Sequence, residues 1–191
     1  MQKEVYISVD IESTAGHSPG RYSMYQVGAC LVENLDITFF AELKLLNSNS
    51  DPRSLRACGV TLSELLLKGV EPKTVMRNFA EWINFTRGGG RAIFVGFNTP
   101  FDWKFVDWYF HEFFGFNPFG VGGIDIKAYY MGMMACGFGE TIKRKVKKRF
   151  PCSLPHTHNA LDYAREQAEL FRKLLEFNQA RKVNLMTVSP W

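Results

Sequence analysis

One alternating stretch near the start of the chain restricts its possible folds most strongly. Residues 5–12 read Val-Tyr-Ile-Ser-Val-Asp-Ile-Glu, so apolar and polar side chains alternate with the period of a β-strand. Asp10 and Glu12 therefore share one face of the predicted strand. A strand rises about 3.3 Å per residue, so these two positions lie about 7 Å apart and their carboxylates can converge on one point.

The acidic face of this strand has two interpretations. Like charges this close raise each other's pKa unless a cation lies between them. Carboxylates on a rigid strand suit Mg²⁺ or Mn²⁺, which prefer hard oxygen ligands. An edge strand with a solvated acidic face would give the same pattern, and most short acidic patterns are surface features. The pair alone therefore leaves both interpretations open.

Length and composition favour one globular domain over residues 1–191. The chain is 46% apolar with 17 phenylalanines, which is enough for one core. No apolar run approaches 18 residues, and the first predicted strand begins after four residues, so we expect neither a signal peptide nor a membrane span. The four cysteines are scattered without C-x-x-C spacing. They are typical of reduced thiols in a cytoplasmic protein.

Strands and helices are expected to alternate along the chain. The predicted strands cover residues 5–12, 24–32, 37–46, 92–97 and about 122–126. The predicted helices cover residues 61–69, 71–87, 100–114, about 127–134 and about 158–180, and residues 13–20 and 47–53 are predicted loops. This order predicts an α/β fold with a mixed five-stranded sheet, three strands antiparallel and then two parallel, with the first strand in the centre.

Two later segments bring polar groups towards the first strand. Asn98 and Asp102 follow an apolar strand, and the carboxyl ends of strands are where α/β sheets bind ligands. Asp102 is also what a helix N-terminus prefers for its dipole. Near the C-terminus, His158 and Asp162 are four residues apart and would share a helix face. A helix start with a surface His-Asp pair is the alternative interpretation there.

A basic run precedes the last helix. Its six positive charges fall in seven positions: Lys143, Arg144, Lys145, Lys147, Lys148 and Arg149. Such a run is either a solvated helix face or loop, or a contact for a polyanion. The net charge of the chain is +4, which allows either.

Taken together, the motifs resemble one family. Asp10-x-Glu12, then Asn98-x-x-x-Asp102 after a hydrophobic strand, then His158-Asn-Ala-Leu-Asp162 look like the three motifs of the DEDDh 3′-to-5′ exonucleases. These belong to the ribonuclease H-like superfamily and include ribonuclease T, oligoribonuclease and proofreading subunits. The resemblance spans Val5 to about Phe177, and the order of strands and helices is that of the family.

One position departs from the family pattern. The family places four residues between its last histidine and its last aspartate. Counted from His158, that spacing puts the aspartate at position 163, where this chain has Tyr163. The available acid is Asp162, one position earlier and rotated by about 100° on a helix. Either Asp162 reaches the site, or the fourth carboxylate is missing and the second metal site is weakened. We expect a functional Asp162.

The resemblance implies the role of each site residue. Two Mg²⁺ or Mn²⁺ ions would be held by Asp10, Glu12, Asp102 and Asp162, and His158 would be the general base for the attacking water. The 3′-terminal nucleotide and the entering strand would be bound by Thr14, Ala15, Gly16, Asn98, Phe101, Lys143, Arg144 and Lys147. Phe101 is more often a core residue at such a position. Asp125 is expected to be structural.

The expected function is metal-dependent removal of nucleoside 5′-monophosphates from the 3′ end of RNA or single-stranded DNA. A catalytically silent nucleic-acid-binding domain of the same fold is the alternative, suggested only by Tyr163. A proofreading subunit that works with a polymerase is a third option. The expected partner is a nucleic acid, with no membrane, and the chain is a possible homodimer.

Overall fold

The computed structural model describes residues 2–154 and 159–187, with side chains as far as residue 181. Its centre is a five-stranded sheet in the order β3-β2-β1-β4-β5, with β1 in the middle as expected. Its first three strands pair antiparallel, and β4 and β5 continue in parallel from β1, which confirms the predicted mixed sheet. The strands are β1 (Glu4–Ser13), β2 (Met24–Leu31), β3 (Thr38–Glu42), β4 (Arg91–Gly96) and β5 (Gly123–Asp125).

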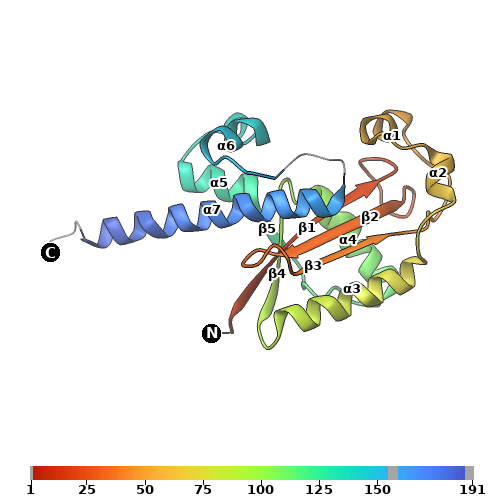
Figure 1. Ribbon diagram of the computed structural model, residues 1–191, viewed down its shortest axis with the longest axis horizontal. Coiled ribbons are helices and arrows are strands. Elements are labelled where there is room, and N and C mark those ends of the chain that lie inside the picture. Colours follow the sequence, from red (N-terminus) through yellow and green to blue (C-terminus); the bar gives the residue numbers. More distant parts are fainter. Residues whose placement is uncertain (1, 155–158, 188–191) are drawn as a thin grey trace.

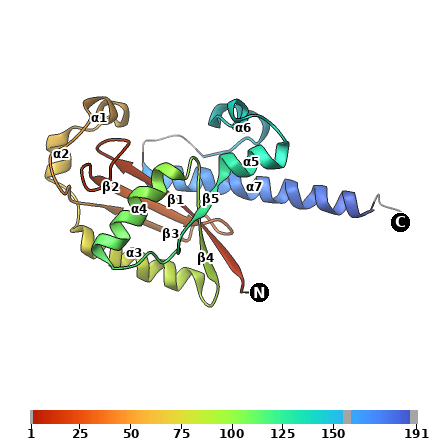
Figure 2. The same cartoon turned by 180° about the vertical axis from the view of Figure 1, so that it is seen from behind.

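Helices cover both faces of the sheet. Figures 1 and 2 show the longest helix, α7, across one face and α3 and α4 across the other. No helix in the described ranges is long and apolar enough to cross a membrane. The helices are α1 (Pro52–Cys58), α2 (Leu62–Leu66), α3 (Pro72–Arg87), α4 (Pro100–Phe113), α5 (Ile126–Met134), the 3₁₀ helix η1 (Phe138–Glu140), α6 (Lys143–Arg149) and α7 (Ala160–Thr187).

The alternation in β1 decides which face each side chain takes. Ile7, Val9 and Ile11 are fully or almost fully buried in the core between the sheet and the helices α3 and α4. The opposite face of the sheet packs against α5, α6 and α7 in a second core that includes Val95 and Phe171. The polar residues of β1 therefore point to the face that α7 covers.

The end of β1 carries an irregularity in its pairing. Asp10 pairs with Gly28 and Glu12 with Gln26, but the register with β2 shifts between Glu12 and Ser13. A β-bulge of this kind bends a strand and ends regular pairing. The strand ends at Ser13, one residue after the second carboxylate.

Gly28 lets α7 lie close to the sheet beside Asp10. A Cβ at this position would lie 2.2 Å from the backbone nitrogen of Leu161 and 2.3 Å from the carbonyl carbon of Ala160. Only a residue without a side chain permits this approach, so the start of α7 lies against the strand position opposite Asp10.

Some local elements differ from those expected. The third strand ends at Glu42 rather than residue 46. Residues 52–58, partly expected to be loop, form α1, with Asp51 as N-cap and Pro52 at the first helical position. Thr61 is the N-cap of α2, and it forms a reciprocal capping box with Glu64.

Candidate active site

Asp102 is joined to the first strand by a backbone hydrogen bond. It lies in the first turn of α4, which Pro100 opens, and only 3% of its surface is exposed. The amide of Ile11, between Asp10 and Glu12, donates to Asp102 Oδ1 at 3.2 Å. This bond brings the start of α4 to the acidic end of β1, so the structure gathers the first three predicted acids at one place.

The carboxylates at this place influence each other strongly. Burial, with the nearby charges of Asp102 and Glu12, raises the pKa of Asp10 well above its ordinary value. Burial raises the pKa of Asp102 to about 8, and Glu12 contributes in the same direction. The Lys143 ammonium lowers the pKa of both Asp10 and Asp102. The group is therefore an acidic cluster with one lysine within electrostatic reach.

α7 contributes a residue that the sequence did not suggest. The Gln167 amide nitrogen donates to Asp10 Oδ1 at 2.6 Å, and its oxygen accepts from the backbone amide of Phe97. Gln167 lies four residues after Tyr163, so both are on the same side of the helix. This i+4 relation to the family's acid position was the available signal, but a glutamine in a long helix is ordinarily a surface residue.

Two expected site residues belong to the sequence around the start of α7: His158 precedes it, and Asp162 is in its first turn. His158, the expected base, is outside the described residues. Asp162 is half-buried in the first turn of α7, and its backbone amide donates to Asn159 Oδ1 at 3.3 Å. Tyr163 is buried, with 8% of its surface exposed, and the Lys143 nitrogen lies 5.3 Å from its ring centre.

A small cavity opens beside Glu12. It measures about 220 Å³ and lies between the end of β1, α1 and α4. The Cys58 thiol at its wall donates to Glu12 Oε2 at 3.3 Å. The residues that line it are Glu12, Ser13, Gly16, Ser54, Ala57, Cys58 and Phe101.

The segment after β1 is fixed by its own hydrogen bonds. The Thr14 hydroxyl donates to Asn49 O and accepts from the Ser23 amide, and Ala15 is buried. The Gly16 carbonyl accepts from Lys104 Nζ at 2.8 Å. Of the three expected binding residues in this segment, Gly16 lines the cavity.

Phe101 and Asn98 flank the start of α4. Phe101 packs partly on the core and also lines the cavity. Asn98 is exposed and has a left-handed backbone with φ of 70°. Asp125 Oδ1 accepts from the amides of Asn98 and Lys127, both at 3.0 Å, which caps α5 as a structural acid does.

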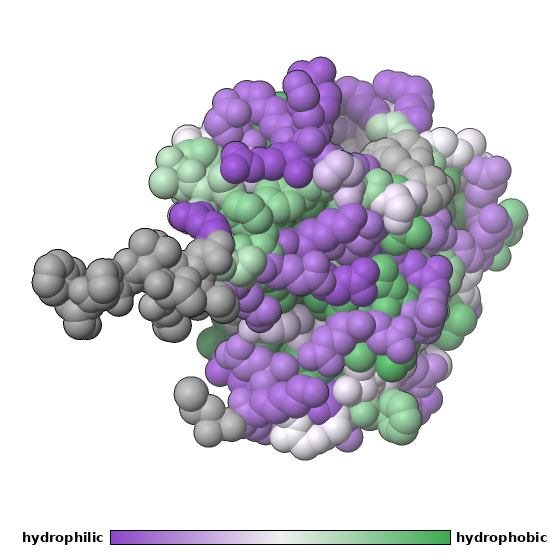
Figure 3. All heavy atoms as spheres, turned by 60° about the vertical axis from the view of Figure 1, so that its left-hand side comes forward, coloured by the Kyte–Doolittle hydropathy of each residue, from purple (hydrophilic) through white to green (hydrophobic). Residues whose placement is uncertain are grey.

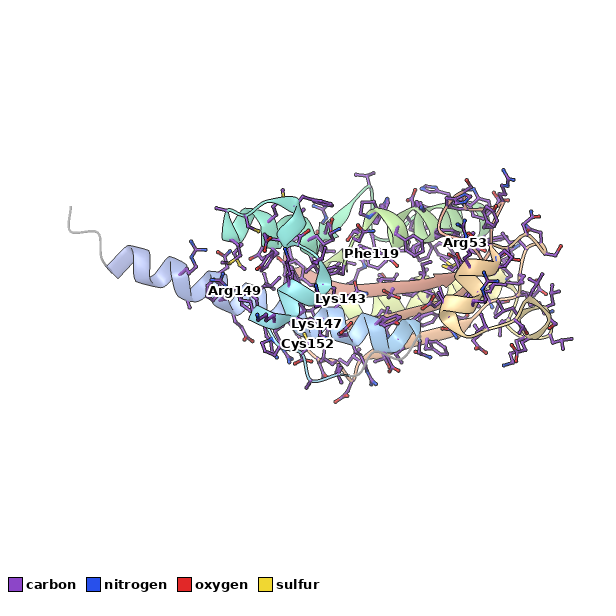
Figure 4. All side chains as sticks on the ribbon, turned by 90° about the horizontal axis from the view of Figure 1, so that it is seen from above. Arg53, Phe119, Lys143, Lys147, Arg149 and Cys152 are labelled. Carbon is purple, nitrogen blue, oxygen red and sulfur yellow. The ribbon has the colours of Figure 1, made fainter. Side chains whose placement is uncertain are left out.

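The basic run forms the short helix α6 and divides into two sides. Val146 is buried, and Lys143 and Lys147 turn towards α7, as Figure 4 shows. Four others are exposed: Arg144, Lys145, Lys148 and Arg149. Hydrophilic side chains cover much of the upper part of the molecule in Figure 3, where α6 lies.

The acidic cluster has the chemistry of a divalent-cation site. Burial, and then the charges of neighbouring carboxylates, raise the pKa of Asp10 and Asp102. Within the described ranges, however, no three acidic, histidine or cysteine side chains converge tightly enough to cage an ion. Asp10 is instead bonded to an amide. The oxygen ligands that Asp10, Glu12 and Asp102 offer are of the type that a hard cation binds. In the described residues, however, fewer acidic side chains lie close together than the four that the family pattern has.

Comparison with known proteins identifies a relative that matches nearly the whole chain. No protein-family model matches the chain. The chain is 37% identical over 183 residues to the 3′-5′ DNA exonuclease Cap18 of Escherichia coli, covering 95% of this chain and 97% of that protein.

Solved structures with low identity share the fold. The nuclease domain of 3′hExo, a DEDDh family member bound to rAMP, superposes with a TM-score of 0.72 at 14% identity, covering 91% of this chain and 92% of that chain. The Mg²⁺- and Mn²⁺-bound form of S. pombe Pop2p gives a TM-score of 0.58 at 14% identity, covering 88% of this chain and 82% of that chain.

Proposed function

Because the chain belongs to the DEDDh family of 3′-to-5′ exonucleases, we propose that it removes nucleoside 5′-monophosphates from the 3′ end of DNA with divalent metal ions. One observation carries the proposal: the Ile11 amide bonds the buried Asp102 to the strand that bears Asp10 and Glu12. Three acids from two distant segments are thereby held at the carboxyl end of the central strand. DNA is proposed as substrate because the relative at 37% identity is a DNA exonuclease.

Asp10, Glu12 and Asp102 are the proposed metal-holding residues. A bound divalent ion lowers the pKa of a water nucleophile and neutralises charge on phosphoryl oxygens. The protein's part is to keep the carboxylates in place: β1 fixes Asp10, and the Ile11 amide orients Asp102. Burial and then neighbouring carboxylates raise the pKa of Asp10 and Asp102, and a bound cation would favour the charged form of both, which supports this role.

The cavity beside Glu12 is the proposed site of the terminal nucleotide. Phe101 supplies an aromatic face on which a base can stack, and Gly16 leaves room without a side chain. Lys104 lies 5.2 Å from the Phe101 ring centre and places a positive charge next to this site. His158 remains the expected base for the attacking water.

The test is release of mononucleotides from matched 5′-labelled and 3′-labelled single-stranded DNA and RNA oligomers with Mg²⁺ or Mn²⁺. We expect 3′-end shortening that chelation with EDTA stops and that Asp10→Asn reduces at least a hundredfold. Asp36→Asn is the matched control, because Asp36 is an exposed acid on the turn after β2. DNA binding without mononucleotide release under both metals would favour the silent binding domain and contradict the proposal.

A further inference from the structure

An exposed phenylalanine and a lysine lie together on the side of the molecule that α5 and η1 form. Phe138, on η1, leaves 69% of its surface exposed, and Lys127 Nζ lies 4.3 Å from its ring centre. A single exposed apolar side chain is ordinary on a protein surface. A ring beside an ammonium is more specific, because single-stranded nucleic acids are bound by aromatic faces for their bases and positive groups for their backbone.

The turn that carries Phe138 is fixed by hydrogen bonds. Thr141 is buried, and its hydroxyl and its amide both donate to the Phe138 carbonyl, at 2.7 and 3.0 Å. Lys145 Nζ donates to the Gly139 carbonyl at 3.2 Å. The backbone is held in place while the ring stays at the surface, so little further ordering is needed when a base stacks on it.

Hydrogen bonds connect Lys127 with the acidic cluster. Lys127 Nζ donates to Asn98 Oδ1 at 3.3 Å, and Asn98 follows Phe97 just after β4. The Phe97 amide donates to Gln167, whose amide nitrogen donates to Asp10 Oδ1 at 2.6 Å. This lysine and its aromatic partner therefore lie on the side of the acidic cluster where Asp10 meets α7.

The cavity proposed for the terminal nucleotide lies on the other side. It is bordered by Glu12, α1 and α4, whereas the lysine and the ring belong to α5 and η1. Figures 1 and 2 show α1 on one side of the molecule and α5 with α6 on the other. An extended strand with its last nucleotide in the cavity and its scissile phosphate at the carboxylates is thereby directed towards η1.

Lys127 keeps its positive charge for a ligand. Within the described ranges it forms no ion pair, since its ammonium contacts the Asn98 amide oxygen and the Phe138 ring, which are both neutral. The nearby lysines of α6 are instead paired with acids: Lys143 and Lys147 with Glu166, and Lys145 with Glu140. An ammonium outside an ion pair neutralises a phosphate without first giving up a carboxylate.

A basic hollow borders the same turn. It measures about 460 Å³ and lies between α5, η1 and α6. Its lining residues are Tyr130, Glu140, Lys145, Lys148 and Arg149. Three of these are basic and one is acidic, so a backbone that passes Phe138 meets a positive surface.

We propose that Phe138 and Lys127 bind the part of the strand that precedes its 3′-terminal nucleotide: a base stacks on the Phe138 ring, and the Lys127 ammonium contacts a backbone phosphate. The proposal rests on the exonuclease function proposed above and adds a substrate contact outside the cavity beside Glu12. Stacking accepts every base, so the contact favours single strands of any sequence. Duplex ends are disfavoured, because their bases must first be unstacked.

The first measurement is the dissociation constant of a 5′-labelled oligomer of twelve thymidines, by fluorescence anisotropy with EDTA present so that cleavage does not interfere. We expect Phe138→Ala to weaken binding at least about fivefold, the lower end of what loss of one base–aromatic stack costs, and Phe138→Trp to retain it. Phe85→Ala is the matched control, because Phe85 is 85% exposed on α3, which packs on the opposite face of the sheet. A dissociation constant for Phe138→Ala within twofold of the control would overturn the proposal, as would a wild type that does not bind the oligomer.

The second measurement separates stacking from a structural role. An abasic oligomer of the same length keeps every phosphate but only its 3′-terminal base. We expect Phe138→Ala to bind this oligomer as tightly as the wild type does, because no base is left to stack on the ring. Equal weakening on both oligomers would show that Phe138 acts through the fold and would contradict the proposal.

The third measurement tests Lys127 through salt. We expect Lys127→Met to reduce the slope of log affinity against log salt by about 0.7, the value for one phosphate contact on a single strand. Lys73→Met is the control, because Lys73 is an exposed lysine of α3. Equal slopes for the two variants would contradict the phosphate contact.

These binding results are independent of mononucleotide release by the wild type. A chain that binds through Phe138 but does not cut would retain this contact and refute the exonuclease function. A chain that cuts, but whose binding does not depend on Phe138, would refute the contact and leave the exonuclease function standing.

Discussion

Replacing Gly28 by alanine should disturb the active site without touching any catalytic group. Gly28 pairs with Asp10 across the sheet, and the new Cβ would meet the backbone of Ala160 and Leu161. Those atoms belong to the start of a helix and cannot rotate away as a side chain would. The start of α7 must therefore move from the sheet, and it carries the segment that leads to Tyr163 and Gln167.

The size of the effect follows from the contact distance. The Cβ would lie 2.2 Å from the Leu161 nitrogen, whereas ordinary contacts begin near 3.4 Å, so a shift of more than 1 Å is needed. Overpacking of this kind costs about 1–3 kcal/mol of unfolding free energy. A displacement of about 1 Å at a catalytic constellation costs about a hundredfold in rate.

The assay compares urea unfolding, followed by tryptophan fluorescence, with initial rates on a DNA oligomer. Gly132→Ala is the matched control: Gly132 lies in α5, and a Cβ there meets no atom within 4 Å. We expect the control to keep its activity and to gain up to about 1 kcal/mol, since alanine favours a helix. A Gly28→Ala protein with wild-type stability and rate would refute this account of the close approach.

Three further predictions follow from other contacts. Burial raises the pKa of Asp102 to about 8 in the folded protein, so the neutral form stabilises the metal-free protein at low pH and this stability is lost as pH rises from about 4 to 8. Asp102→Asn should therefore reduce the pH dependence of the free energy of unfolding, measured by urea unfolding at several pH values. An unchanged pH dependence would disprove this. Thr61→Ala should cost about 1 kcal/mol, because it removes the capping box of α2, and equal urea midpoints would contradict this. Arg144→Ala with Lys148→Ala should reduce the salt dependence of single-strand binding by about 0.7 per lost phosphate contact, measured by fluorescence anisotropy, and an identical slope would show that α6 does not contact the strand.

The sheet was predictable because its strands carry their own periodic signals. The alternation in residues 5–12 fixed both the strand and the side of its acids, and the apolar run at 92–97 indicated a strand buried on both faces. α1 was missed because its seven residues contain one buried side chain, Leu55, which gives no periodic pattern. Its cap signal, Asp51-Pro52, is present but lies in the segment predicted to be a loop, residues 47–53.

The acidic cluster was also predictable, but its partners were not. Asp10, Glu12 and Asp102 belong to motifs with fixed local positions, on a strand and at a helix start. Gln167 and the Lys143–Glu166 pair depend on how α6 and α7 are placed against the sheet, which is a tertiary property. A run of six basic residues gives no sign of which two turn inward, because that depends on the buried acid of another helix.

The bulge after Glu12 separates the part of β1 in which a change of length would move the carboxylates from the connection in which it would not. Upstream, gaining or losing one residue within β1 would exchange its two faces, sending both carboxylates into the apolar side against α3 and α4. Downstream, residues 14–23 are held by their own hydrogen bonds rather than by the regular ladder, so a change there should leave the register of Asp10 and Glu12 unaltered. A change in residues 14–23 should therefore reshape the cavity that Gly16 lines without moving the two carboxylates along the strand.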